Sequence, residues 1–157
     1  MPQKQIPNIL LAAFLLSAFI GFADAAYLSA KHYVGEIPPC SLVNGCETVL
    51  TSPYATIAGN IPLALVGALY YLTLFIGGII YVDTKNSRVL KAVAYLTAAG
   101  FITSVILVSL QLFVIHALCL YCIASAITST LLFIFGIIIL RKLKQPDSIG
   151  NMPMLMR

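Results

Sequence analysis

The sequence contains four cysteines, arranged in two pairs whose spacing allows thiol chemistry. Cys119 and Cys122 form a C-x-x-C motif, and five residues separate Cys40 from Cys46. Cysteines three positions apart lie on one face of a helix, so small adjustments allow a disulfide bond between them. A disulfide this short closes almost no loop and adds little stability, which leaves redox cycling as its more natural use. The spacing therefore predicts thiol–disulfide exchange.

The C-x-x-C motif begins an apolar segment that we expect to be helical, and this position bears on its chemistry. The unpaired N–H groups and partial positive charge of a helix N-terminus favour the thiolate form of Cys119. Three other interpretations stay open: inert thiols packed as small apolar residues, two static disulfides, or a zinc site. Zinc is the least favoured, because a C-x5-C spacing in an open loop makes a poor cage. No metal site is predicted.

The composition indicates that most of the surface faces lipid. Hydrophobic residues make up 61% of the chain and charged residues 9%, whereas a soluble domain carries roughly 25% charged residues. The net charge of +4 arises from Lys and Arg clustered between apolar runs. Such clustering is typical of membrane topology and does not indicate nucleic-acid binding, which would need a basic face beside aromatic residues.

Four apolar runs of at least 22 residues each are long enough to span a bilayer. They are residues 6–28, 61–82, 92–115 and 117–140. Only His116 separates the last two, and a single helix of that length would be too long for one crossing, so the chain must turn near residues 116–119. The prediction is an all-α membrane protein: one domain over residues 1–157, a four-transmembrane-helix bundle with a long loop at residues 31–60. The first run also allows a cleaved signal peptide, although it is longer than such segments usually are.

The distribution of positive charge predicts the orientation of the bundle. Basic residues precede the first run, lie between the second and third, and follow the fourth. They include Lys4, Lys85, Arg88, Lys91, Arg141, Lys142 and Lys144. The loop itself carries Lys31 against Glu36 and Glu47. Both termini are therefore expected in the cytoplasm, and the loop on the extracytoplasmic side.

All four cysteines then fall on the extracytoplasmic side, although the charge argument did not use them. This is the oxidising side, where disulfides persist. A flexible Cys40–Cys46 pair in the loop can exchange with protein thiols in water, while the C-x-x-C motif can meet a lipid-soluble electron acceptor.

These residues resemble the vitamin K epoxide reductase family, in its bacterial and archaeal branch. The resemblance runs from about Gly21 to Ser129. Besides the two cysteine pairs, its motifs are DAAYL at residues 24–28, CETVL at 46–50, SPYA at 52–55 and IPLA at 61–64. A C-x-x-C motif alone would be a weak signal, whereas this combination in this order is specific.

The resemblance implies a quinone-dependent thiol oxidoreductase with a four-helix bundle around the quinone. By resemblance, Cys122 reduces the quinone, Cys119 exchanges with Cys46 of the loop, and Cys40 meets the substrate protein. Many bacterial relatives carry a fused thioredoxin-like domain, whereas this sequence ends soon after its fourth apolar run. We therefore expect a separate thioredoxin-fold partner.

Two positions favour an ordinary respiratory quinone, of the ubiquinone or menaquinone type, over vitamin K epoxide. Animal members have a tyrosine four residues after the second cysteine, where this chain has Ala126, and an asparagine near the start of helix two, where the closest residue is Leu63. We expect the quinone pocket among the outer halves of the helices, roofed by Leu50, Ser52 and Tyr54. Ser52 is expected to donate a hydrogen bond there.

Two further alternatives concern Asp24 and the protein as a whole. An intramembrane carboxylate such as Asp24 is a functional candidate, but we favour a structural role, in which it reaches lipid headgroups or Lys31. The competing function is a membrane scaffold or assembly factor with two static disulfides. Alkylation after mild reduction separates the two, because an exchanger gives mixed oxidation states and a scaffold shows no change.

Overall fold

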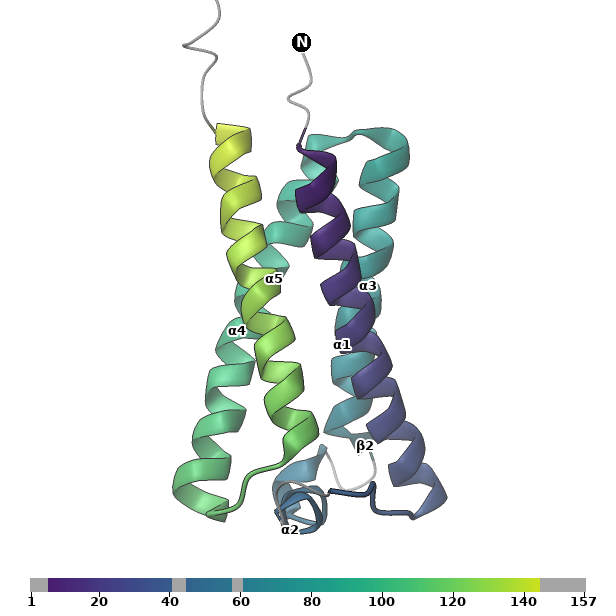
Figure 1. Cartoon of the computed structure of the whole chain (residues 1–157), viewed down its shortest axis with the longest axis vertical. Coiled ribbons are helices and arrows are strands. Elements are labelled where there is room, and N and C mark those ends of the chain that lie inside the picture. The colour runs from purple at the N-terminus through teal and green to yellow at the C-terminus, as the bar shows by residue number, and fades with distance from the viewer. Residues whose placement is uncertain (1–5, 41–44, 58–60, 145–157) are drawn as a thin grey trace, which may run out of the picture.

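Four long helices make up most of the chain. The structure is a computed structural model that describes residues 6–40, 45–57 and 61–144. The long helices are α1 (Asn8–Val34), α3 (Leu63–Thr84), α4 (Ser87–Leu110) and α5 (Leu120–Lys144), and α4 continues into a π-helical turn, η2 (Gln111–Ile115). Each is long and apolar enough to cross a membrane. The predicted bundle of four transmembrane helices is confirmed (Figure 1).

The helices begin and end at residues other than those that bound the apolar runs. Helix α1 continues past Leu28 to Val34 and ends at Gly35, whose left-handed backbone (φ 73°) directs its N–H group to the carbonyl of His32. Helix α4 begins before Ala92, at Ser87, because the side chain of Asn86 accepts a hydrogen bond from the N–H of Arg88 (2.9 Å). Hydropathy marks the apolar length, whereas caps determine where a helix stops. The loop predicted at residues 31–60 includes 41–44 and 58–60, which lie outside the described residues.

The four long helices form a closed ring in which each packs against two others. Helix α1 packs against α3 and α5, and α4 packs against the same two helices. The largest fully buried hydrophobic side chains of this core are Phe14, Leu74, Leu90, Leu132 and Ile139.

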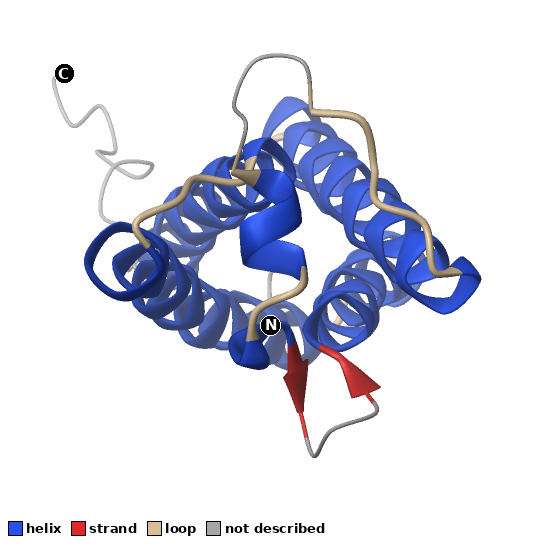
Figure 2. Ribbon diagram, turned by 90° about the horizontal axis from the view of Figure 1, so that it is seen from below, coloured by secondary structure: helices blue, strands red, loops and turns tan. Residues whose placement is uncertain are grey.

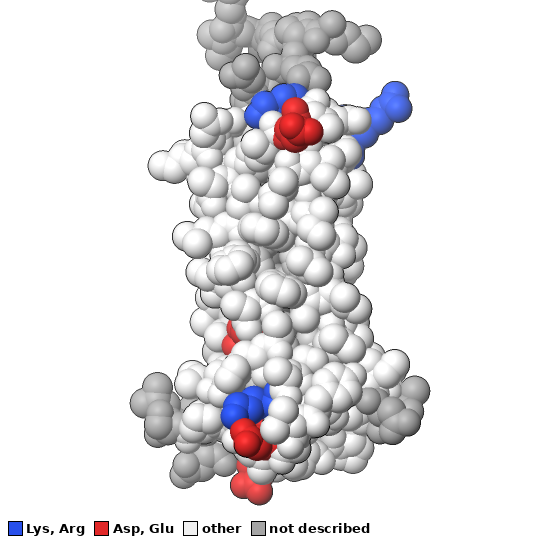
Figure 3. All heavy atoms as spheres, turned by 90° about the vertical axis from the view of Figure 1, so that its right-hand side faces the viewer, with Lys and Arg blue, Asp and Glu red and all other residues white. Residues whose placement is uncertain are grey.

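The outer surface of the ring is apolar, as a lipid-facing surface must be. Large hydrophobic side chains point outward, among them Ile9 (82% exposed) and Phe113 (76% exposed). On the face shown in Figure 3, charged side chains gather toward the two ends of the bundle, and the middle of this face is uncharged. Soluble monomeric proteins rarely expose an apolar surface of this extent, so this surface is expected to face lipid. The chain is an integral membrane protein.

Short elements cover one end of the bundle. Between α1 and α3 lie helix α2 (Cys46–Leu50), the 3-10 turn η1 (Pro53–Ala55) and strands β1 (Thr56–Ile57) and β2 (Ile61–Pro62), which pair antiparallel. Seen from this end, α2 lies across the centre of the ring, with the two strands at its rim (Figure 2). The beginning of α1, the α3–α4 connection and the end of α5 lie at the other end (Figure 1).

The turn between α4 and α5 lies where the length argument requires it. His116 adopts a left-handed backbone (φ 53°) at the end of η2. The N–H of Ala117 donates to the carbonyl of Gln111 (3.1 Å), which closes a wide turn before α5 begins at Leu120. The predicted reversal near residues 116–119 is confirmed, and it brings the C-x-x-C motif to the end covered by α2.

A tyrosine connects the helices midway along the bundle. Tyr71 of α3 is buried, and its hydroxyl donates to the backbone carbonyl of Ser125 on α5 (2.7 Å) and lies 3.2 Å from Oγ1 of Thr128. A Cβ atom on Gly21 would lie 2.5 Å from the Tyr71 ring, so the glycine lets α1 approach this side chain closely. These contacts hold α5 in place where Ser125 faces the interior.

We expect Tyr71→Phe to lower the free energy of unfolding by roughly 0.5–2 kcal/mol, the contribution of interhelical hydrogen bonds in membrane proteins. Unfolding in mixed micelles measures the change. Tyr95→Phe is the matched control, because Tyr95 is 67% exposed on the outer face of α4. Equal effects of the two substitutions would contradict a stabilising role for the Tyr71 hydroxyl.

Candidate active site

The two cysteine pairs lie against each other at the covered end of the bundle, in different oxidation states. Cys40 and Cys46 form a disulfide, with their Cα atoms 6.2 Å apart, while Cys119 and Cys122 carry free thiols. Cys46 and Cys119 are both almost completely buried, and with Val49 they form one apolar cluster against which Cys40 and Cys122 pack. The fold thus brings together the four cysteines that the sequence singles out.

A glycine makes this approach possible. Gly45 begins helix α2, and a Cβ atom at this position would lie 2.5 Å from the carbonyl oxygen and 2.7 Å from the nitrogen of Leu118. No side chain fits against backbone at that distance. Gly45, the neighbour of Cys46, therefore contacts Leu118, the neighbour of Cys119, backbone to backbone.

A hydrogen bond attaches the other side of the loop disulfide to α5. The hydroxyl of Tyr121 donates to the carbonyl of Pro39 (3.2 Å), the residue before Cys40. The Tyr121 ring also packs on Tyr27 of α1, with their centroids 5.6 Å apart. The loop disulfide is thus held against the C-x-x-C segment from both sides.

Cys119 occupies the N-cap position of α5, as the C-x-x-C motif at a helix start predicts. Its carbonyl accepts a hydrogen bond from the N–H of Ile123 (3.0 Å), and its sulfur lies beside the N–H groups of Tyr121 and Cys122. A hydrogen bond from the Cys122 thiol contributes most to a lowered pKa of Cys119, the two N–H groups add to it, and burial opposes both. The thiolate of Cys119 is favoured as a result.

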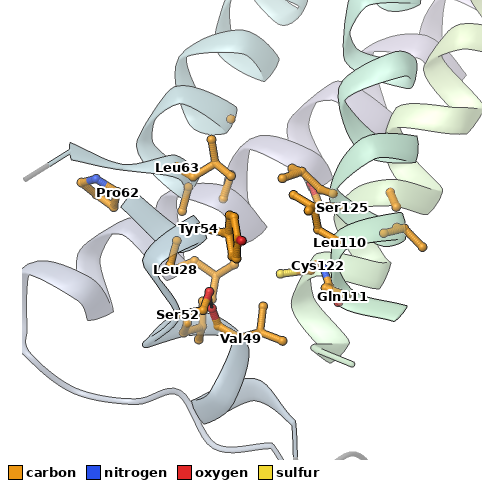
Figure 4. Close-up of a pocket in the computed structure, with 18 of the residues that line it drawn as sticks. Leu28, Val49, Ser52, Tyr54, Pro62, Leu63, Leu110, Gln111, Cys122 and Ser125 are labelled. Atoms are coloured by element: carbon orange, nitrogen blue, oxygen red, sulfur yellow. Dashed lines mark hydrogen bonds between the residues drawn. The ribbon is translucent and has the colours of Figure 1, made fainter. Parts of the chain in front are cut away.

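Gln111 is a site residue that the sequence-based interpretation missed. It is buried, and its side-chain Oε1 accepts a hydrogen bond from the N–H of Cys119 (3.1 Å). Figure 4 shows Gln111 beside Cys122. The π-helical turn that begins at Gln111 directs this side chain inward, and such turns are frequent at functional sites. The available signal was a single amide within the apolar run at residues 92–115.

A cavity lies beside Cys122, between α1, α3, α4, α5 and the loop. The cavity has a volume of about 150 Å³ and is partly open to the exterior, and most of its wall is aliphatic. The three residues predicted to contact a cofactor, Leu50, Ser52 and Tyr54, all belong to the wall. Figure 4 shows Ser52 and Tyr54 there. Of the four cysteines, Cys122 alone is part of it.

Ser52 lies in the wall, but its hydroxyl is engaged differently from what we expected. It donates to the carbonyl of Val49 (2.7 Å), which stabilises the end of α2. The hydroxyl hydrogen is therefore not directed at the cavity, and the oxygen remains as an acceptor. The two positions at which the sequence departs from animal relatives, Leu63 and Ala126, also line the cavity.

Asp24 belongs to the cavity wall as well. Lys31, the cation that we expected it to reach, forms an ion pair with Glu36 instead. Helix α1 extends to Val34, so Asp24 lies further from the end of its helix than the apolar run indicated. Of the two partners expected for a structural role of Asp24, Lys31 is therefore engaged elsewhere, and the lipid headgroups remain.

A membrane bundle that holds a disulfide against a free C-x-x-C motif, beside an apolar cavity, has the parts of a membrane redox protein. Comparison with known families agrees. The sequence model of the vitamin K epoxide reductase family matches residues 12–137, and the chain belongs to this family. A search of the curated proteins found no match. The family is one of quinone-linked thiol oxidoreductases, and membership implies that the protein is a redox enzyme.

The contact of Gly45 with Leu118 predicts the behaviour of a Gly45→Ala variant. Overpacking of this kind destabilises the docked position of α2 by about 1–3 kcal/mol. The population of molecules with α2 displaced should therefore rise roughly 5- to 150-fold. Alkylation of Cys119 by iodoacetamide should accelerate accordingly. Thr48→Ala, an exposed position on the same helix, is the control, and an unchanged rate in Gly45→Ala would refute the role of the contact.

The lowered pKa of Cys119 predicts a shift in reactivity with pH. Removal of the Cys122 thiol in Cys122→Ala deletes the largest contribution, so the pKa of Cys119 should rise and less thiolate should be present at neutral pH. Cys122→Ser retains a hydrogen-bond donor and should shift less. The midpoint of the alkylation rate against pH measures the change, and equal midpoints in wild type and Cys122→Ala would contradict this account.

Proposed function

We propose that the protein oxidises thiols with a respiratory quinone, of the ubiquinone or menaquinone type, and passes the resulting disulfides to a separate thioredoxin-fold partner. The observation that carries this proposal is the contact between an oxidised pair, Cys40–Cys46, and a reduced pair, Cys119 and Cys122. Two cysteine pairs in contact exchange electrons through a mixed disulfide.

The cavity fits a quinone head group. Apolar side chains make up most of its wall, and a small number of polar groups stand among them, as in typical cofactor sites. Leu50, Tyr54 and Leu63 would hold the ring, with Ser125 and Gln111 among the polar groups. When bound, a quinone supplies an acceptor for two electrons and two protons. Cys122 is the cysteine in the cavity wall and thus the one that would face the ring.

The exchange between the pairs balances in electrons and protons. A partner dithiol reduces the Cys40–Cys46 disulfide and leaves with a disulfide of its own. The loop dithiol then reduces the Cys119–Cys122 disulfide through a mixed disulfide of Cys46 with Cys119, which lie in one buried cluster. After this step the loop is oxidised and the C-x-x-C motif reduced. The Cys40–Cys46 disulfide beside free Cys119 and Cys122 supports such a state in the cycle.

The burial of the loop cysteines supports their division of roles. Cys46 is almost completely buried against Cys119, whereas Cys40 is half-buried and retains an exposed portion. An incoming thiolate must reach a sulfur from outside, and Cys40 offers that access. Cys40 would therefore receive the partner, and Cys46 would pass electrons inward.

The charge distribution supports an extracytoplasmic location for the cysteines. The basic side chains of α4 and α5 that lie near the end opposite to α2 include Arg88, Lys91 and Arg141, while the covered end carries Lys31 with Glu36 and Glu47. By the positive-inside rule the first end faces the cytoplasm. The disulfide would then face the compartment in which disulfides persist.

The test separates quinone-dependent oxidation from partner relay. Cys119→Ala and Cys122→Ala should each abolish oxidation of a thioredoxin-fold substrate coupled to decylubiquinone. Cys40→Ala and Cys46→Ala should abolish it too, yet spare oxidation of dithiothreitol, which reaches the C-x-x-C motif without the loop. Quinone absorbance measures both reactions in the same preparation.

The competing function, a scaffold with two static disulfides, makes the opposite prediction. A scaffold would show no quinone reduction with either thiol, and its activity in assembly would tolerate loss of the C-x-x-C motif. If the loop variants lost dithiothreitol oxidation as completely as Cys119→Ala does, the relay order would be wrong. Trapping of a Cys40-linked mixed disulfide in Cys46→Ser would identify the partner-facing cysteine directly.

A further inference from the structure

Asp24 supplies an acidic side chain to the cavity wall, and the thiol-exchange steps described above do not involve it. Its Oδ2 atom is buried and has no hydrogen-bond partner among residues 6–40, 45–57 and 61–144. The nearest cation along α1, Lys31, is paired with Glu36. A carboxyl group buried in this way needs either a proton of its own or a partner supplied by a ligand.

The other titratable groups near Asp24 are less suited to exchange a proton inside the cavity. His32 and Tyr54 share the wall, but both are exposed. By the helical rise, Asp24 lies roughly 12 Å from His32 along α1, on the side away from the covered end of the bundle. From α5, Cys122 lies in the same wall, and Cys119 and Tyr121 are close enough to interact with the Asp24 charge.

We propose that Asp24 hydrogen-bonds to a carbonyl oxygen of the quinone in this cavity and transfers to it one of the two protons that reduction requires. The inference rests on the proposed function and adds a proton path to it. Its geometric basis is a buried, unpartnered carboxyl oxygen in the same wall as the Cys122 thiol.

The step balances through the cysteines. Oxidation of the Cys119 and Cys122 thiols breaks two S–H bonds, forms one S–S bond and releases two electrons and two protons. Asp24 gives its proton to the quinone oxygen and then takes up the proton that Cys122 releases. The carboxyl group returns to its starting state. Cys119 releases its proton to solvent, and the second quinone oxygen takes up a proton from solvent through the open side of the cavity. Both electrons and two protons then reside on the quinol.

Two substitutions separate proton transfer from hydrogen bonding. Asp24→Asn keeps the shape of the side chain and a hydrogen-bond donor, but it cannot deliver a proton. Asp24→Leu removes both functions. Asp83→Asn is the matched control, because Asp83 is an exposed acid at the opposite end of α3.

With decylubiquinone as the probe, we expect Asp24→Asn to slow quinone reduction on the order of 100-fold, the usual contribution of a positioned acid. Binding is measured separately in a Cys119→Ser/Cys122→Ser background, which cannot turn over. There, Asp24→Leu should weaken binding roughly tenfold by loss of a hydrogen bond, while Asp24→Asn should bind as the parent does. The infrared carbonyl stretch of the bound quinone should shift upward in Asp24→Leu alone.

Asp24→Asn and Asp24→Leu variants that match Asp83→Asn in turnover, binding and infrared spectrum would overturn the proposal. If Cys119→Ala were still inactive, the proposed function would stand without Asp24. A wild-type protein that neither binds nor reduces decylubiquinone would overturn both.

Discussion

The backbone contact between Gly45 and Leu118 determines whether the two cysteine pairs of this protein can meet. Each residue is the immediate neighbour of a cysteine, and neither can move away without separating Cys46 from Cys119. The bundle supplies one side of this contact through the wide turn that Gln111–Ile115 and His116 make. The loop supplies the other side through α2. Four helices, a turn and a surface helix thus converge on a contact between two backbones.

Much of the fold could be predicted from the sequence, because lipid leaves few choices. Backbone polar groups in hydrocarbon must be paired within each segment, so long apolar runs become helices. The reversal near His116 followed from length alone. The helix ends did not, since Gly35 and Asn86 determine them by local hydrogen bonds that hydropathy does not report.

The site was predictable in its chemistry and less so in its supporting contacts. The cysteine spacing and the positions of Leu50, Ser52 and Tyr54 pointed to the region that the cavity occupies. Gln111 was missed because a regular α-helical periodicity does not anticipate a π-helical turn, which changes the direction of every side chain after it. The expected partners of Asp24 and Ser52 also differ from those in the structure, for the same kind of reason. Their partners depend on which groups tertiary packing places within reach. Lys31 pairs with Glu36 instead of Asp24, and the Ser52 hydroxyl donates to the Val49 carbonyl instead of to a ligand.

The complete burial of Cys119 beneath α2 limits which thiols can transfer electrons to this cysteine. Small soluble thiols such as glutathione have no path to this sulfur from the aqueous side while α2 is in place. Electrons from the aqueous side would therefore enter through a protein that engages the loop disulfide. A membrane-permeable dithiol such as dithiothreitol would reach the C-x-x-C motif from the membrane side instead. Helix α2 thus separates the Cys119 sulfur from thiols dissolved in water, and it blocks direct electron transfer from them to this cysteine.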